Sequence, residues 1–245
     1  MPLPALDSQT WKSPPRVFAW GMRSVGSTVL ALVLFATYLG IGALAHDSRF
    51  SLGWVLASTA LVWAGPAQII LISTLGSGAT AVQAALAVTV SAIRLFPMVV
   101  SVLPLLRTPT TKRRHLILPT HFIAVTLWVE CYRLLPKVPR ERRVVFTCGL
   151  GIGLVLVCLT ATTVGYMLAA NLPEALAAAI LLLTPLAFLL STARNAKHLV
   201  DVLALLLGLA LYPLVSLLNT GVDILISGLS AGTIAFGVHW WRRRT

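Results

Sequence analysis

A glycine-proline pair interrupts one hydrophobic run of this chain, and a single arginine lies inside the next. Gly65 and Pro66 form the pair, Gln68 follows two positions later, and Arg94 lies near the middle of the second run. Proline has no amide hydrogen and clashes with the carbonyl four residues earlier, so the pair predicts a broken helix. Freed backbone groups, a side-chain amide and a cation are groups that hold a solute at membrane depth. We therefore predict that substrate-binding groups include Gly65, Pro66, Gln68 and Arg94.

These features also have structural interpretations. A glycine-proline pair is a common packing kink in membrane helices. Arg94 keeps its proton and needs an anion, carbonyl groups or water, so an internal ion pair would satisfy it as well as a substrate carboxylate. Pro97 follows three residues later, and a kink there would expose carbonyl groups to the guanidinium. The sequence leaves both interpretations of Arg94 open.

His121 and Glu130 are two ionisable residues nine positions apart in a third apolar run. Histidine titrates near neutral pH and burial can bring a glutamate into that range, so the pair is a candidate proton relay. The two side chains would share a helical face only on one continuous helix. The alternative, which we favour, places Glu130 at the membrane interface beside Arg133, its helical partner three residues on.

The composition is that of a membrane protein. Hydrophobic residues make up 58% of the 245 residues, charged residues make up 11%, and the mean hydropathy is +0.89. A soluble domain has about 25% charged residues. The net charge of +12 comes from short basic clusters between apolar runs, which is the positive-inside pattern of membrane proteins, so we expect no nucleic-acid partner.

Apolar segments of about 20 residues, enough to cross a bilayer, follow one another with short connections. They cover residues 24–46, 51–75, 81–106, 116–135, 144–170, 175–193, 199–219 and 221–241. We predict an all-α, polytopic transmembrane helical bundle with six to eight membrane segments, including broken or re-entrant helices. The transporter domain at 24–241 would lie between a cytoplasmic basic N-terminal segment at 1–23 and a cytoplasmic basic C-terminus at 242–245.

The basic loops indicate the orientation. Residues 137–143 and both termini are basic, whereas residues 171–174 and 219–223 carry no basic side chain, so both termini are expected in the cytoplasm. Residues 107–115 carry four basic side chains but would lie outside if every segment crossed. They would lie inside if the second and fourth segments were re-entrant. Irregular backbone at membrane depth is tolerated only when it is buried in protein or lines a cavity. The sequence leaves both paths open.

Residues 62–68 (VWAGPAQ), followed by Gly76-Ser77-Gly78 and an apolar helix with Arg94, resemble the signature of the AzlC family. Chain length, segment order and residues 184–188 (TPLAF) fit as well. The family's Ala-Gly-Ala-Ser-Gln corresponds to residues 64–68, which keep the glycine and the glutamine. Its Thr-Asp-Glu corresponds to residues 120–122 (THF), where both acids are absent. The chain thus resembles a divergent member.

The resemblance implies an inner-membrane subunit of a bacterial exporter for branched-chain or similar apolar amino acids, working with a small AzlD-like membrane subunit. A cation or a helix N-terminus would suit the substrate carboxylate. The missing acids keep a second hypothesis open, a non-transporting membrane scaffold or regulatory subunit. We expect no enzyme, because no HExxH motif, intramembrane aspartate pair or Ser/His pair is present. We also expect no cofactor or metal, since the three isolated cysteines, Cys131, Cys148 and Cys158, lack metal-site spacing.

Overall fold

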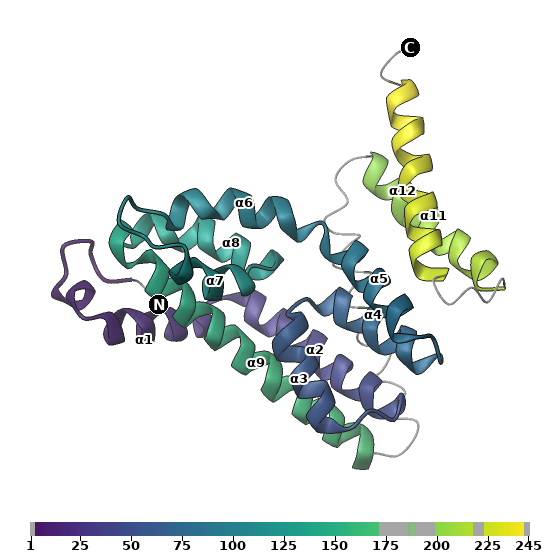
Figure 1. The fold of residues 1–245 in the computed structure, drawn as a ribbon, viewed down its shortest axis with the longest axis horizontal. Helices are drawn as coiled ribbons and strands as arrows, with labels where there is room; N and C mark the ends of the chain where they lie inside the picture. The colour runs from purple at the N-terminus through teal and green to yellow at the C-terminus, as the bar shows by residue number, and fades with distance from the viewer. Residues whose placement is uncertain (1–2, 172–185, 187–188, 190–198, 218–222, 243–245) are drawn as a thin grey trace.

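The computed structural model describes residues 3–171, 186, 189, 199–217 and 223–242 (Figure 1), and all regular elements in these ranges are helical. The expected segment 175–193 and the TPLAF stretch fall almost entirely outside the described residues. Helical runs long and apolar enough to cross a membrane are Leu30–Asp47, Arg140–Asn171 and Leu199–Ser216, with Ala81–Ala92 and Leu95–Leu106 as a fourth if that bent pair is one span. The all-helical membrane class is confirmed, whereas six to eight crossings are not.

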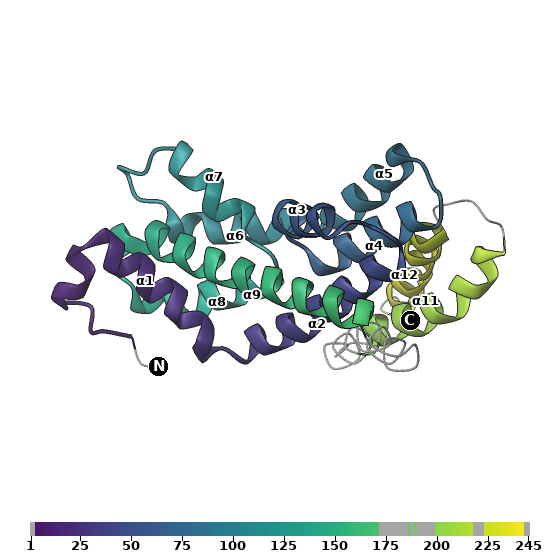
Figure 2. The ribbon, with the colours of Figure 1, turned by 90° about the horizontal axis from the view of Figure 1, so that it is seen from below.

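The N-terminal helices lie along α9 (Arg143–Asn171) over most of its length (Figures 1 and 2). Helix α1 (Pro14–Ser24) begins with two prolines. Prolines are tolerated there because the first residues of a helix donate no intrahelical hydrogen bond. A 3₁₀ turn (Val25–Ser27) leads into α2 (Val29–Asp47), whose first turn is capped by the Thr28 hydroxyl. The predicted N-terminal segment is therefore largely helical and packed, and Val17 within it is fully buried.

Glycines on α9 allow this close packing. A Cβ at Gly149 would meet the backbone of Phe18 in α1, and one at Gly165 would meet the backbone of Leu39 in α2. Small residues at such points let membrane helices approach each other closely. Because Phe18 precedes Leu39 just as Gly149 precedes Gly165, the α1–α2 run and α9 are parallel.

Residues 52–76 form a hairpin of two short helices. Helix α3 (Leu52–Val62) is capped by Ser51 and ends at Trp63, which adopts a left-handed backbone conformation with φ of 41°. Helix α4 (Gly65–Gly76) returns beside it. A Cβ at Gly76 would lie 3.3 Å from the Cβ of Ser48, which precedes α3. This first hairpin therefore begins and ends at the same end of the molecule, which we call the far end.

The next run returns to the end where α9 begins. Helix α5 (Ala81–Ala92) starts at a capping box of Thr80 and Gln83, and the axis bends by 49° before α6 (Leu95–Leu106). Helix α5 packs on α4, and α6 packs on α8 (Val125–Leu134). At the end of α6, the backbone oxygen of Leu105 accepts a hydrogen bond from Nη1 of Arg143, the first residue of α9, at 3.1 Å.

A second hairpin begins and ends at that same end. Helix α7 (Arg114–His121) leads in, the chain breaks at residues 122–124, and α8 leads back. Two 3₁₀ turns, Leu135–Lys137 and Arg140–Arg142, connect α8 to α9. Nη2 of Arg142 also donates to the backbone oxygen of Lys12 at 3.1 Å. We call this end, with the N-terminal segment and residues 107–113 and 137–143, the basic end.

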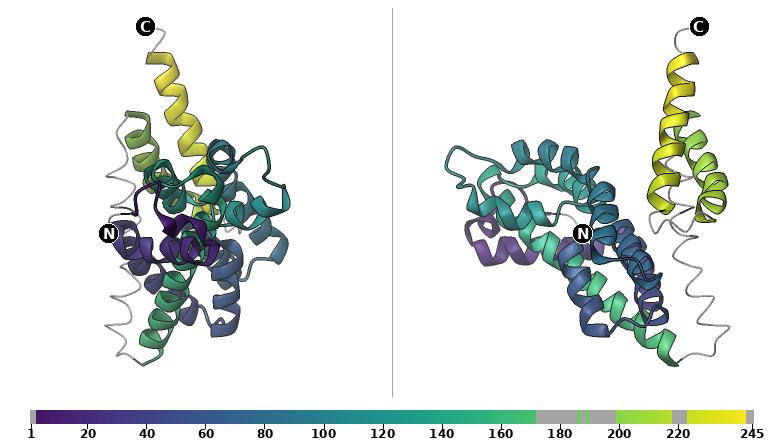
Figure 3. Two further views of the ribbon diagram at one scale, coloured as in Figure 1. Left: turned by 90° about the vertical axis from the view of Figure 1, so that its left-hand side faces the viewer. Right: turned by 45° about the vertical axis from the view of Figure 1, so that its right-hand side comes forward.

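Of the two paths left open for residues 107–115, this one agrees with the path in which the second and fourth segments turn back as hairpins. The loop lies at the same end as residues 137–143, because α7 and α8 form a hairpin that turns back. Residues 29–76 and 81–134 have the same order, a long run followed by a hairpin, but they run in opposite directions. Helices α11 (Leu199–Ser216) and α12 (Asp223–Arg242) pack on each other (Figure 3).

Candidate functional site

The tips of the two hairpins meet through two hydrogen bonds. The indole Nε1 of Trp63 donates to the backbone oxygen of Phe122 at 2.6 Å. Nε2 of His121 lies 3.0 Å from the backbone oxygen of Ala60 and must carry the proton, because a carbonyl only accepts. The Trp63 and Phe122 rings are edge to face with centroids 6.3 Å apart. The tips therefore hold each other in place.

Both returning helices begin at this meeting point without a side-chain cap. Their N-cap residues are Ala64 for α4 and Ala124 for α8, and neither side chain can accept a hydrogen bond. Helix N-termini carry partial positive charge and free amide hydrogens. The two hairpins approach from opposite ends, so two uncapped N-termini lie in the region of the tip contact. Such an arrangement is suited to a carboxylate.

Gly65 and Pro66 do not form the break itself. They occupy the first two positions of α4, where the missing amide of a proline costs nothing, and the break falls just before them at Trp63 and Ala64. The predicted interruption of residues 51–75 is confirmed, and its position differs by one to two residues.

Gln68 is fully buried and links the first hairpin to α9. Its Nε2 donates to the hydroxyls of Ser58 at 2.9 Å and Thr59 at 2.8 Å. Both hydroxyls already donate to the backbone oxygen of Val55, so they can only accept from Gln68. Thr59 also lies 3.4 Å from the hydroxyl of Thr162 on α9. This leaves Oε1 of Gln68 as a buried acceptor without a partner in the described residues.

Arg94 lies at the bend between α5 and α6, as the N-cap of α6. Because α5 packs on the first hairpin and α6 on the second, the bend lies where the run passes from one hairpin to the other. Arg94 is exposed, and its guanidinium makes no hydrogen bond or ion pair within the described part of the chain. Pro97 lies in the first turn of α6, and the 49° bend falls at residues 93–94 just before it, so the kink expected beside Arg94 is present.

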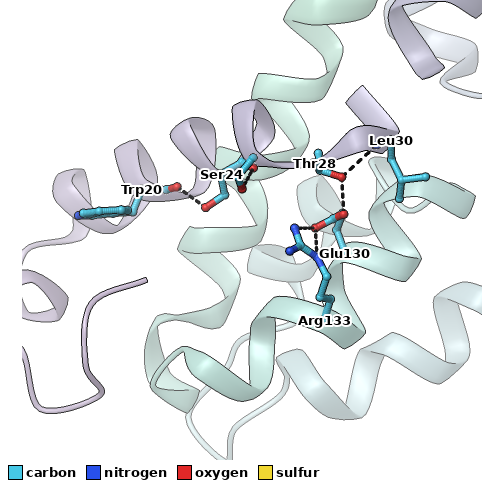
Figure 4. A network of polar contacts seen from close by, with 7 residues as sticks. Trp20, Ser24, Thr28, Leu30, Glu130 and Arg133 are labelled. Atoms are coloured by element: carbon cyan, nitrogen blue, oxygen red, sulfur yellow. Dashed lines mark hydrogen bonds and ion pairs between the residues drawn. The ribbon is translucent and has the colours of Figure 1, made fainter. Parts of the chain in front are cut away.

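His121 and Glu130 lie on different helices, because the chain breaks between them. Glu130 is 2% exposed, and its Oε1 accepts a hydrogen bond from the Thr28 hydroxyl at 2.6 Å (Figure 4). Its Oε2 accepts from Nε of Arg133 at 2.9 Å and from Nη2 at 2.5 Å. Arg133 is thus the partner of Glu130 that the alternative interpretation named. The proton relay remains a prediction, without the shared helix that it required.

Several residues of this site were not expected from the sequence. Trp63 and Phe122 form the tip contact, and Phe122 packs where Gly151 of α9 has no side chain. Ser58 and Thr59 orient Gln68. Trp63 was visible only as part of the motif around Gly65. Residues 122–124, where the chain breaks, include no glycine or proline, and Pro119 near the end of α7 was the only local signal.

A family model described as AzlC protein matches residues 29–172, which is more than half of the 245-residue chain. The match begins with α2 and ends one residue beyond α9, so it contains both hairpins and the residues of the tip contact. No curated protein and no solved structure matches the chain. The matched region, together with the all-helical membrane fold, shows that the chain belongs to the AzlC family.

Proposed function

We propose that this chain is the inner-membrane subunit of an exporter for branched-chain or similar apolar amino acids, and that its substrate site lies where the hairpin tips meet. Membership of the AzlC family supports a role in membrane transport. The observation that carries the specific proposal is the pair of uncapped helix N-termini, at Ala64 and Ala124, beside the tip contact. Discontinuous helices with N-termini directed at a substrate carboxylate recur in secondary transporters.

Arg94 supplies the full charge in this proposal. A guanidinium at mid-membrane costs about 2.5–3.5 kcal/mol on insertion scales, and the described residues provide it with no anion. A substrate carboxylate would offset that cost by accepting two parallel hydrogen bonds. The buried Oε1 of Gln68 would accept from the substrate ammonium group or from water. The substrate side chain would contact the apolar residues around the tips.

The exposure of Arg94 supports a partner subunit. Its neighbour Phe96 is 72% exposed, so the bend presents a cation and an aromatic ring on an uncovered surface. We propose that a small AzlD-like membrane subunit covers the α5–α6 bend and separates Arg94 from lipid. A photo-crosslinking residue at Phe96 should then capture that subunit in cells that produce both proteins, whereas one at Leu32 on α2 should not.

Efflux of radiolabelled valine tests the function. Cells producing the chain with its partner subunit should export preloaded valine faster than cells without it. Arg94→Ala should abolish this difference while the protein still inserts, and Arg94→Lys should retain only part of it, because an ammonium group cannot form the bidentate pair. Arg113→Ala is the control, since it removes an exposed arginine at the basic end.

Two results would contradict the proposal. If Arg94→Ala exports valine and leucine as fast as the unaltered chain, the guanidinium has no role in transport. If the unaltered chain produces no efflux of any branched-chain amino acid, the scaffold alternative is favoured. The loss of the family's two acids at residues 121 and 122 is the observation that keeps that alternative.

A further inference from the structure

An open pocket of about 490 Å³ lies at the basic end, away from the hairpin tips. It is lined by Val100, Leu103 and Pro104 of α6, by Arg107 after that helix, and by Arg140 in the turn before α9. Its volume is within the range of ligand sites, which is about 300–1,000 Å³. The lining therefore combines three apolar residues of α6 with two arginines.

Arg143 holds the two arginine-bearing segments together. Its Nη1 donates to the backbone oxygen of Leu105, and its Nε donates to the backbone oxygen of Val138, both at 3.1 Å. These bonds join the end of α6 to the connection between α8 and α9. The position of Arg107 relative to Arg140 is thus set by the fold, although the two residues are 33 positions apart in the sequence.

Neither guanidinium of the pocket has a partner among the described residues. The side chains of Arg107 and Arg140 make no ion pair and no hydrogen bond in that part of the chain. Both side chains are exposed. Two unneutralised cations that share one pocket repel each other, so a ligand with negative charge would stabilise the arrangement.

The apolar part of the lining indicates what kind of anion fits. Val100 is 49% exposed and Pro104 is exposed as well. Pro104 has no amide hydrogen, so the backbone oxygen of Val100 lacks its usual helical donor and can accept from a ligand hydroxyl. A free phosphate would leave this part of the lining uncovered. A phosphoglycerol head group with its first acyl carbons would contact both parts of the lining.

We propose that this pocket binds an anionic phospholipid, with the phosphate between Arg107 and Arg140 and the beginning of the acyl chains against α6. Basic pockets at the cytoplasmic ends of membrane helices hold such head groups. The site requires that α6 reaches the membrane interface at the basic end. It does not depend on amino-acid export, so it can be tested separately from the proposed function.

Native mass spectrometry of the purified full chain, titrated with mixed micelles, measures the binding. We expect phosphatidylglycerol to bind more tightly than phosphatidylcholine. Each arginine should contribute roughly fivefold to the affinity, so Arg107→Gln with Arg140→Gln should weaken phosphatidylglycerol binding roughly 25-fold. The matched control is Lys112→Gln with Arg113→Gln, which removes the same charge from exposed side chains of the neighbouring loop and should preserve the affinity.

A second variant tests the apolar part of the lining. Val100→Trp should fill the pocket, keep both arginines and weaken phosphatidylglycerol binding severalfold. The proposal is overturned if the pocket variant and the loop control lose affinity equally, since net charge alone would then explain binding. It is also overturned if sn-glycerol 1-phosphate displaces the lipid at equal concentration, because the site would then recognise a free anion.

Discussion

The indole of Trp63 donates a 2.6 Å hydrogen bond to the backbone oxygen of Phe122. These residues are 59 positions apart, and each lies at the break of a different hairpin. The bond joins the end of α3, which comes from the far end, to the end of α7, which comes from the basic end. Irregular backbone at membrane depth needs hydrogen-bond partners. Here, backbone oxygens near each break accept hydrogen bonds from a side chain at the break of the other hairpin.

Removing the indole donor should weaken this contact. Trp63→Phe keeps an aromatic ring but leaves the Phe122 oxygen without its partner, which should lower stability by about 1–3 kcal/mol. The thermal midpoint of the purified protein should fall accordingly. Trp54→Phe, on the same helix, is the control because the indole nitrogen of Trp54 makes no hydrogen bond in the described structure. Equal midpoints for the two variants would show that the tip bond contributes nothing.

The position of the first break could largely be predicted from the sequence. Proline fixes φ and removes an amide donor, and glycine is a poor helix former, so Gly65 and Pro66 indicated an interruption. Because a proline is tolerated in the first turn of a helix, the break lies just before the pair, at Trp63. Pro97 likewise lies in the first turn of α6, directly after the 49° bend that separates α6 from α5.

A re-entrant fourth segment was one of the two paths left open by the sequence, but the position of its break could not be predicted, because that position depends on tertiary contacts. Phe122 leaves the helix where Gly151 provides space for its ring and where Trp63 provides a donor for its oxygen. Neither partner is near in sequence. The pairing of Arg107 with Arg140 in one pocket has the same origin, since it depends on how the second hairpin turns back.

The space that Gly151 provides should be essential. A Cβ at this position would overlap the ring of Phe122, so Gly151→Ala should cost about 1–3 kcal/mol through overpacking. The thermal midpoint should fall, and Phe122→Leu in the same chain should restore part of the loss. Gly53→Ala has no neighbouring atom within 4 Å and lies inside α3, so it should be neutral or slightly stabilising. If Gly151→Ala were as stable as Gly53→Ala, the ring would not pack there.

His121 and Glu130 should act independently. His121 bonds to α3, and Glu130 bonds to Thr28 and Arg133. We therefore expect the effects of His121→Gln and Glu130→Gln on valine efflux to multiply in the double variant, within the roughly 0.3–0.5 kcal/mol error of additivity. A proton relay would instead make either single variant nearly as slow as the double variant. Efflux rates of the four chains distinguish these outcomes.

The two loops that follow the first hairpin and α6 should lie on opposite sides of the membrane. Ser77 is at the far end and Thr110 is at the basic end. In intact cells, a membrane-impermeant maleimide should label Ser77→Cys, whereas Thr110→Cys should be labelled only after permeabilisation. The unaltered chain is labelled in the same way, to measure the signal that comes from the native cysteines Cys131, Cys148 and Cys158. Labelling of both positions from the same side would contradict the inverted order of the two hairpins, and labelling of Thr110→Cys alone from outside would contradict the cytoplasmic placement of the basic end.

Substrate protection tests the central claim that both hairpin tips form the amino-acid site. In inverted membrane vesicles containing Ala64→Cys or Ala124→Cys, the rate of reaction with a small methanethiosulfonate reagent is measured with and without valine. We predict that valine slows modification at both positions severalfold, that lysine does not, and that Gly53→Cys at the far end is unaffected by either. Equal rates with and without valine at both tips would contradict the claim.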